Sequence, residues 1–342
     1  MKALYTPAPG QFDLVDRPMP KPAADEALVK VANVAICHTD VIIKSGKAGH
    51  VRYPVIPGHE FSGIVEACGP GVRYIEPGDR VAVHTVIACG QCPSCRRGDT
   101  MSCDHYDELG SKRDGGFAEY CAMPARCLFK LPDHISLAEG ALMEPLANAV
   151  SVLRWARVGS GDRIVVIGPG PIGLLALQVA RLAQPAALIL VGTRDERLAL
   201  GTALGASHVI NIKQQGATEN LKQILRGKGA DVVLECAGTR SSLELAMEIA
   251  GWRARIAVEG VFDQEEMIPI SPHGLLLSRA ASIIGVNGWL TADFAQAHDL
   301  LIRGLVNVKP LITHTFPIAE WQAAFRLITE HKSQALKVEF VF

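Results

Sequence analysis

Four cysteines at short spacing carry the strongest chemical signal in the chain: Cys89, Cys92, Cys95 and Cys103. They lie in one loop, so their thiolates can surround a single zinc ion tetrahedrally. Four sulfurs leave no open position for a substrate, and such a site is structural. The alternatives are paired disulfides, which a cytoplasmic setting disfavours, and a redox Cys-x-x-Cys, which needs only two cysteines.

A second, dispersed set offers the ligand types of a catalytic zinc, which keeps an open position beside about three protein ligands. Its members are Cys37, His59, Glu60 and Glu144. Spacing does not show that they converge, because they lie far apart in the chain. Taken singly, a buried core thiol, a hydrogen-bonded loop histidine and a solvated glutamate remain equally acceptable interpretations.

The segment Gly168-Pro169-Gly170-Pro171-Ile172-Gly173 follows an apolar strand and begins a helix, as a dinucleotide-binding turn does. Its three glycines permit, in order, a tight turn, the approach of a pyrophosphate to the backbone, and close packing of helix on strand. The helix N-terminus adds free N–H groups and a partial positive charge. The alternative is a purely structural Gly/Pro turn.

The turn after the next expected strand favours NADP over NAD. An NAD site places a carboxylate at this strand end for the ribose 2′-hydroxyl, but here the residue is Gly192. Thr193, Arg194 and Arg197 offer a hydroxyl and two guanidinium groups to a 2′-phosphate. Alternatively, the arginines are ordinary solvated charges and Asp195 binds the ribose after a loop shift.

The elements around these sites predict an α/β protein. Short strands broken by Gly and Pro fill the first part, including 27–34, 63–67, 80–84 and 117–123. From Arg163 onward, continuous apolar strands alternate with helices, which predicts a doubly wound parallel sheet covered on both faces. The last stretch, Leu336–Phe342, alternates enough to be an edge or closing strand.

Length and composition support this division and narrow the function classes. The 342 residues exceed the roughly 250–300 at which a single core stops growing. A formal net charge of −1 gives no reason to expect nucleic acid or an anionic membrane as partner. No apolar run reaches about 20 residues and no signal-peptide pattern begins the chain, so a cytoplasmic protein with a small-molecule substrate is expected.

The motifs Cys37-His38-Thr39-Asp40, Gly58-His59-Glu60-x2-Gly63, the four-cysteine loop and the glycine-rich turn follow one another in an order that resembles the zinc-dependent medium-chain dehydrogenase/reductases. The resemblance spans nearly the whole chain. Glu144-Pro145-Leu146 is similar to the sorbitol, threonine and butanediol dehydrogenase branch. It implies a zinc-dependent oxidoreductase that transfers a hydride between a secondary alcohol or polyol, or its ketone, and NAD(P).

The resemblance also implies the arrangement of the chain and the roles of its residues. A GroES-like catalytic domain would comprise residues 1–148 and 289–342, a Rossmann domain 149–288, and the catalytic zinc would lie in the cleft between them. Cys37 and His59 would bind it, with Glu60 or Glu144 as the further ligand. Thr39 would relay the alcohol proton, which water or the ribose hydroxyls would pass to His38 or to solvent. His38 and Lys337 would contact cofactor phosphates, although Lys337 is equally acceptable as a solvated strand residue.

The sequence indicates less about the identity of the substrate and about the oligomeric state. Residues 41–53 and 285–289 are expected to line the pocket, and Trp289 there either packs or stacks on the substrate. Polyol dehydrogenases of this branch often place an Arg-Tyr pair near the second segment, whereas this chain has Asn287-Gly288-Trp289, which favours a shorter or less polar secondary alcohol.

A threonine-type amino-alcohol dehydrogenase is the main alternative. A zinc-free reductase or non-catalytic protein of this fold is disfavoured by the complete ligand set. Relatives are usually dimers or tetramers.

Overall fold

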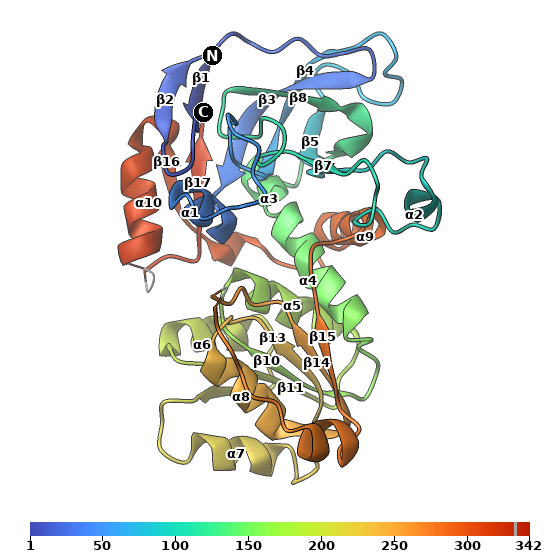
Figure 1. Ribbon diagram of the computed structural model, residues 1–342, viewed down its shortest axis with the longest axis vertical. Coiled ribbons are helices and arrows are strands. Elements are labelled where there is room, and N and C mark those ends of the chain that lie inside the picture. Colours follow the sequence, from blue (N-terminus) through green and yellow to red (C-terminus); the bar gives the residue numbers. More distant parts are fainter. Residues whose placement is uncertain (264, 332–333) are drawn as a thin grey trace. The chain divides into compact units, whose positions relative to one another are not determined.

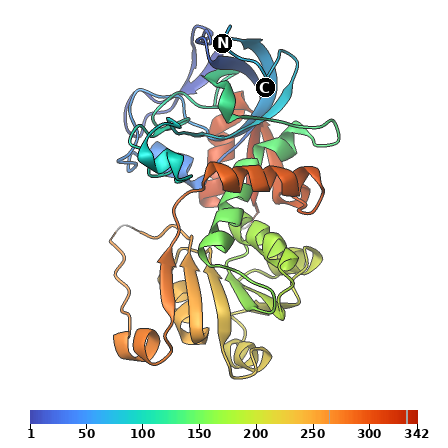
Figure 2. The same cartoon turned by 90° about the vertical axis from the view of Figure 1, so that its right-hand side faces the viewer.

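The computed structural model describes residues 1–263, 265–331 and 334–342, which form two compact units (Figures 1 and 2). One unit contains Met1–Pro145 and Leu290–Phe342, and the other contains Leu146–Trp289. The divisions expected from the sequence, after residues 148 and 288, lie within about three residues of these. One unit is mostly β and the other contains a parallel sheet with helices, which confirms the expected α/β class. Among the described residues, no helix combines the length and apolar character that crossing a bilayer requires.

The first unit is built on a seven-stranded sheet with the order β16-β17-β3-β4-β5-β9, in which β8 also pairs with β3. Its strands are β3 Glu26–Ala35, β4 Glu60–Cys68, β5 Arg80–Val83, β8 Tyr120–Pro124, β9 Leu128–Lys130, β16 Ile312–Pro317 and β17 Lys337–Val341. The terminal strand β17 lies between β16 and β3, so of the two expectations, an edge or a closing strand, the edge strand is wrong. The alternation of side chains shows which residues share a face, but not whether a strand has hydrogen-bonded neighbours on one side or on both.

The remaining elements of this unit surround the sheet. They are β1 Lys2–Tyr5, β2 Asp13–Asp16, β6 Val86–Ile87, β7 Asp107–Glu108, α1 His38–Lys44, α2 Pro93–Arg96, α3 Leu137–Ala141, α9 Thr291–Ile302, α10 Trp321–Glu330 and the short 3-10 turns η1 Ala125–Cys127, η3 Lys309–Leu311 and η4 Ile318–Glu320. Helix α4, Met143–Trp155, begins in this unit and continues into the other.

An aromatic cluster supports the segment that precedes β4. The ring of Phe117 packs edge-on against Phe340, with their centroids 5.2 Å apart, and both side chains are fully buried. Gly58 lies directly on Phe117, where a Cβ would come within 2.8 Å of the Phe117 nitrogen, and its φ of +88° also favours glycine. The backbone before His59 is therefore held tightly against the core.

The second unit has a six-stranded parallel sheet in the order β12-β11-β10-β13-β14-β15. The strands are β10 Arg163–Ile167, β11 Ala187–Gly192, β12 His208–Asn211, β13 Ala230–Glu235, β14 Ala250–Val258 and β15 Ser282–Gly285; the helices are α5 Pro171–Leu182, α6 Asp195–Ala203, α7 Ala217–Ile224, α8 Arg240–Ile249 and the π-helical turn η2 Pro272–Leu277. The strand order reverses between β10 and β13, which confirms the doubly wound topology and marks the edge where such sheets bind ligands.

Candidate functional site

Neighbouring strands bring three dispersed residues into one group. Residue Ala35 at the end of β3 pairs with Glu60 at the start of β4, so Cys37, two residues further on, lies beside His59 and Glu60. One ligand atom each from Cys37, His59 and Glu60 lies within 4.8 Å of the others. A thiol, an imidazole and a carboxylate form a donor set that suits zinc.

Asp40 organises this group, a role that sequence reasoning missed although the residue lies in the quoted motif. Its carboxylate is fully buried, accepts N–H groups from Cys37 (2.8 Å) and Gly58 (3.3 Å), and lies 3.8 Å from Nδ1 of His59. Burial by itself would lower the pKa of His59, but the charges of Asp40 and Cys37 outweigh it and raise that pKa. A carboxylate behind a ligand histidine fixes its ring and increases its basicity.

Two further charged residues lie at the edge of the group. The ammonium of Lys337 donates to both carboxylate oxygens of Glu60, and both side chains are almost fully buried. Lys337 was expected at a cofactor phosphate or in solvent; its burial on Glu60 shows that it is not solvated. Glu144 lies outside the three-residue group, yet burial and the charge of Glu60 raise its pKa to about 8. Its role as a zinc ligand therefore stays a prediction.

The residues expected to move the proton follow Cys37 on α1. The hydroxyl oxygen of half-buried Thr39 lies 3.7 Å from the Cys37 sulfur, while His38 is exposed. The first helical turn therefore presents a hydroxyl next to the group of ligands and an imidazole at the surface.

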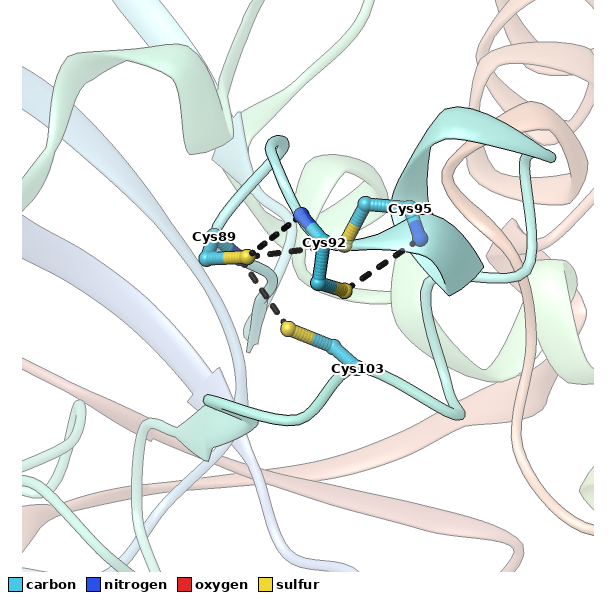
Figure 3. Close-up of side chains that lie close together, drawn as sticks. All are labelled: Cys89, Cys92, Cys95 and Cys103. Atoms are coloured by element: carbon cyan, nitrogen blue, oxygen red, sulfur yellow. Dashed lines mark hydrogen bonds between the residues drawn. The ribbon is translucent and has the colours of Figure 1, made fainter.

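The four clustered cysteines converge around one point (Figure 3). Four sulfurs bound to one zinc at about 2.3 Å would be about 3.8 Å from one another, and the sulfurs of Cys89 and Cys95 are 3.9 Å apart. Backbone N–H groups also donate to the sulfurs. The N–H of Cys92 donates to the Cys89 sulfur at 3.4 Å, and the N–H of Cys95 donates to the Cys92 sulfur at 3.5 Å. Such donors stabilise thiolates, and the N–H of Cys95 lowers the pKa of Cys92 to about 6.

The glycine-rich turn has the form that a pyrophosphate site requires. Gly168 has a φ of +108°, and a Cβ on Gly173 would come within 1.9 Å of the Gly168 oxygen, so both positions need glycine. A Cβ on Gly170, by contrast, would meet nothing within 4 Å, so the backbone there faces open space. The helical ladder starts with Leu174 N–H donating to Gly170, which leaves the preceding amides at the N-terminus of α5 outside it.

The turn after β11 shows a packing cause for Gly192. A Cβ on this residue would come within 2.5 Å of the Pro169 ring, so the absence of an acid here has a steric reason that the sequence did not reveal. Asp195, the alternative ribose ligand, accepts a hydrogen bond from the Asn211 amide at 2.7 Å. Burial and, to a smaller extent, the charge of Arg194 lower the pKa of Arg197 to about 10, so the two guanidinium groups lie within electrostatic reach of each other.

Of the segments expected to line the pocket, 41–53 begins within α1. Trp289 is 6 % exposed, which favours the packing role over a stacking platform.

Comparison with known proteins identifies the family of the chain. Residues 23–133 match the alcohol dehydrogenase GroES-like domain, and residues 171–303 match the zinc-binding dehydrogenase domain. The chain is 34% identical over 339 residues to the L-threonine 3-dehydrogenase of Pyrococcus horikoshii, covering 97% of each chain. The chain belongs to the zinc-dependent medium-chain dehydrogenase/reductase family.

Solved structures of the family superpose over the whole chain. A zinc-binding dehydrogenase from Sinorhizobium meliloti bound to NADP has a TM-score of 0.92 and 30% identity, covering 100% of this chain and 99% of that one. An alcohol dehydrogenase from Escherichia coli CFT073 complexed with NADH has a TM-score of 0.91 and 31% identity, with the same coverage. The protein is therefore an enzyme, a zinc-dependent alcohol or polyol oxidoreductase that uses NAD(P).

Proposed function

We propose that the protein oxidises a secondary alcohol or polyol, or reduces the corresponding ketone, with NADP as the preferred cofactor and with one catalytic and one structural zinc per chain. The observation that carries the proposal is the convergence of Cys37, His59 and Glu60 in a chain that also has a separate four-cysteine group. Three donors of mixed type suit a catalytic zinc, and four sulfurs suit a structural one.

Different side chains of the site bind the metal, orient its ligands and transfer the proton. A bound zinc supplies a Lewis acid that polarises the substrate oxygen, and the nicotinamide accepts or donates the hydride. Cys37 and His59 would hold the metal, and Asp40, 3.8 Å from His59 Nδ1, orients the His59 ring. Thr39 Oγ1 takes the proton of the alcohol and His38 passes it to solvent, because one is half-buried beside Cys37 and the other is exposed. Lys337 holds Glu60 through both carboxylate oxygens and so limits its availability to the metal.

The preference for NADP is supported by the paired guanidinium groups of Arg194 and Arg197. A ribose 2′-phosphate placed between them would relieve their mutual repulsion, and charge-assisted hydrogen bonds from arginine to phosphate are strong. The Asn211 amide donates to Asp195 at 2.7 Å and so occupies one oxygen of the carboxylate that the alternative assigns to the ribose.

Replacing Arg194 by alanine is expected to raise KM for NADP by about tenfold and to change KM for NAD much less. The reason is that only NADP carries the 2′-phosphate. Steady-state kinetics with both cofactors measures the effect, and Arg226→Ala, in a turn of the same unit, serves as the control. An unchanged KM for NADP, or a wild-type kcat/KM for NAD well above that for NADP, would contradict the preference.

Cytoplasmic location and assembly as a homodimer or homotetramer complete the proposal. The edge strand β15 has a neighbour on one side only within the described sheet, and the preceding residues Leu276 and Leu277 are 45% and 70% exposed. An edge strand next to exposed leucines favours pairing with a second copy.

Metal analysis and a substrate panel test the proposed function directly. We expect about two zinc ions per chain and oxidation of secondary alcohols or polyols with NADP. A protein that binds no zinc when purified with added metal, or that oxidises no member of a panel of polyols, secondary alcohols and amino alcohols with either cofactor, would overturn the proposal.

A further inference from the structure

A pocket of about 510 Å³ lies in the first unit, apart from the group of catalytic ligands. Its walls come from residues 17–21, 54–56, 112–114 and 120–122. None of the residues assigned above to the metal, the proton or the cofactor lines it. Sites for small molecules in proteins have volumes of about 300–1,000 Å³. The pocket is therefore large enough for a ligand that is neither the alcohol nor the cofactor.

The charged side chains of this pocket are mostly positive. Four cationic side chains and two carboxylates line it: Arg17, Lys21, Lys112 and Arg113, with Glu26 and Asp114. The whole chain, by contrast, has a formal net charge of −1. Cations gathered in a recess raise the local concentration of anions. The pocket is thus the opposite of the chain as a whole in the sign of its charge.

Both carboxylates of the pocket already have partners. Glu26 accepts a hydrogen bond from the Arg113 guanidinium at 2.6 Å and another from the Ala23 N–H at 3.0 Å. Asp114 accepts the N–H of Ile56 at 2.9 Å. Because the ion pair of Glu26 and Arg113 is neutral as a unit, the three other cations face one remaining carboxylate.

These three cations, Arg17, Lys21 and Lys112, form no ion pair in the part of the chain that the structure describes. The Arg17 guanidinium lies over the Tyr5 ring, 4.6 Å from its centroid, and the Lys112 ammonium lies over the Tyr106 ring at 4.1 Å. An aromatic ring attracts a cation without neutralising its charge. Arg17 and Lys112 are therefore half-buried cations that are held in place and still able to bind an anion.

One wall of the pocket continues into the segment that carries His59. Ile56 lines the pocket, and its oxygen accepts the N–H of Gly115 at 2.7 Å. Two residues further on, the Gly58 oxygen accepts the N–H of Gly116, also at 2.7 Å. A ligand in the pocket therefore contacts the segments whose hydrogen bonds hold the backbone before His59 in place.

We propose that this pocket is an effector site for a small polyanion, a molecule with two or more negative charges on phosphate or carboxylate groups, bound chiefly by Arg17 and Lys112. Guanidinium and ammonium groups make their strong hydrogen bonds with such oxygens. Met19, 54% exposed, and the prolines on either side of it supply apolar contacts for the carbon skeleton. The inference goes beyond the proposed function, because the ligand is not the substrate.

Calorimetry on the zinc-loaded enzyme with saturating NADP tests the site, since NADP fills the phosphate-binding part of the other unit. The probes are propane-1,2,3-tricarboxylate and inorganic phosphate, neither of which carries an alcohol. We expect at least one of them to bind the wild type with a Kd below about 1 mM. The double variant Arg17→Gln/Lys112→Gln is expected to weaken that binding at least about tenfold, and Lys112→Gln alone to weaken it by a smaller factor.

The matched control is Lys30→Gln/Arg303→Gln, which removes the same charge from exposed positions outside the pocket. Tighter binding of the tricarboxylate would identify a polycarboxylate as the ligand class, and tighter binding of phosphate would identify a phosphate-bearing molecule. The site would be refuted if neither probe bound the wild type, if the double variant bound as well as the wild type, or if the control pair weakened binding equally.

Turnover at saturating alcohol and NADP tests the effector role, because an anion that only competes with either of them has no effect there. We expect the tighter probe to change kcat of the wild type at least about twofold and to leave kcat of Arg17→Gln/Lys112→Gln unchanged. The two side chains lie outside the catalytic group, so the double variant should keep its basal kcat. An anion that bound in the pocket without changing kcat of the wild type would overturn the effector role.

Discussion

Replacing Cys37 by alanine is expected to lower kcat by about a thousandfold or more while the protein stays folded. Cys37 is one of three donors that meet within 4.8 Å, so alanine leaves the site with only an imidazole and a carboxylate. A metal acting as a Lewis acid stabilises the transition state by several kcal/mol. A loss of about 4 kcal/mol corresponds to a rate lower by about a thousandfold. Steady-state kinetics with NADP and a secondary alcohol measures it.

The fold is expected to survive because the local structure around Cys37 does not depend on its side chain. The backbone N–H of residue 37 donates to Asp40 and would do so in alanine as well. The zinc content should fall from about two to about one per chain. Cys68→Ala is the control, because Cys68 is a half-buried thiol at the end of β4, outside the group of ligands, and donates to the Ile75 oxygen at 3.5 Å. A variant that kept near wild-type kcat, or kept both zinc ions, would show that Cys37 is not a catalytic ligand.

The two metal sites differ in how far the sequence could predict them. The four cysteines lie within 15 residues of one another, so the loop itself brings them together and spacing is sufficient evidence. The other set depends on which strands are neighbours. Cys37 and Glu60 meet because β3 pairs with β4 in a register that places Ala35 opposite Glu60, and no local pattern encodes that pairing.

Lys337 shows the same limit for a single residue. Strand periodicity indicates which side chains of β17 share a face, but not that this face is covered or what lies opposite. Lys337 lies on a covered face of the sheet, where it is buried and its ammonium binds Glu60. Gly192 is a related case, because the sequence suggested an electrostatic reason for the missing side chain and the structure shows the Pro169 ring in its place.

The glycine-rich turn was predictable because its function depends on consecutive residues. The strand, the turn and the helix follow one another directly, and each glycine has a steric role that concerns its immediate neighbours. The order of the strands was not predicted, since apolar runs indicate a parallel sheet without fixing which run lies at its edge.

Replacing Cys92 by serine is expected to lower the melting temperature of the protein by about 10 °C or more and to remove one zinc without changing the ligands of the other. Loss of a bound metal is among the few single changes that cost more than about 4 kcal/mol. In a unit of about 200 residues, each kcal/mol corresponds to roughly 2–4 °C. Thermal unfolding in the presence of saturating zinc, followed by circular dichroism, measures the shift.

The size of this effect follows from what the cysteine loop contains besides the metal site. Cys89 and Cys95 are only half-buried, and the one helix in the loop, α2, has four residues, none of them buried. A four-residue helix is not stable by itself, so the loop depends on the metal for its structure. Cys68→Ser is the control, since it makes the same chemical change outside the loop and should lower the melting temperature by much less. If Cys92→Ser left both the melting temperature and the zinc content unchanged, the four cysteines would not form a structural zinc site; if it lowered kcat without affecting stability, their metal would belong to catalysis instead.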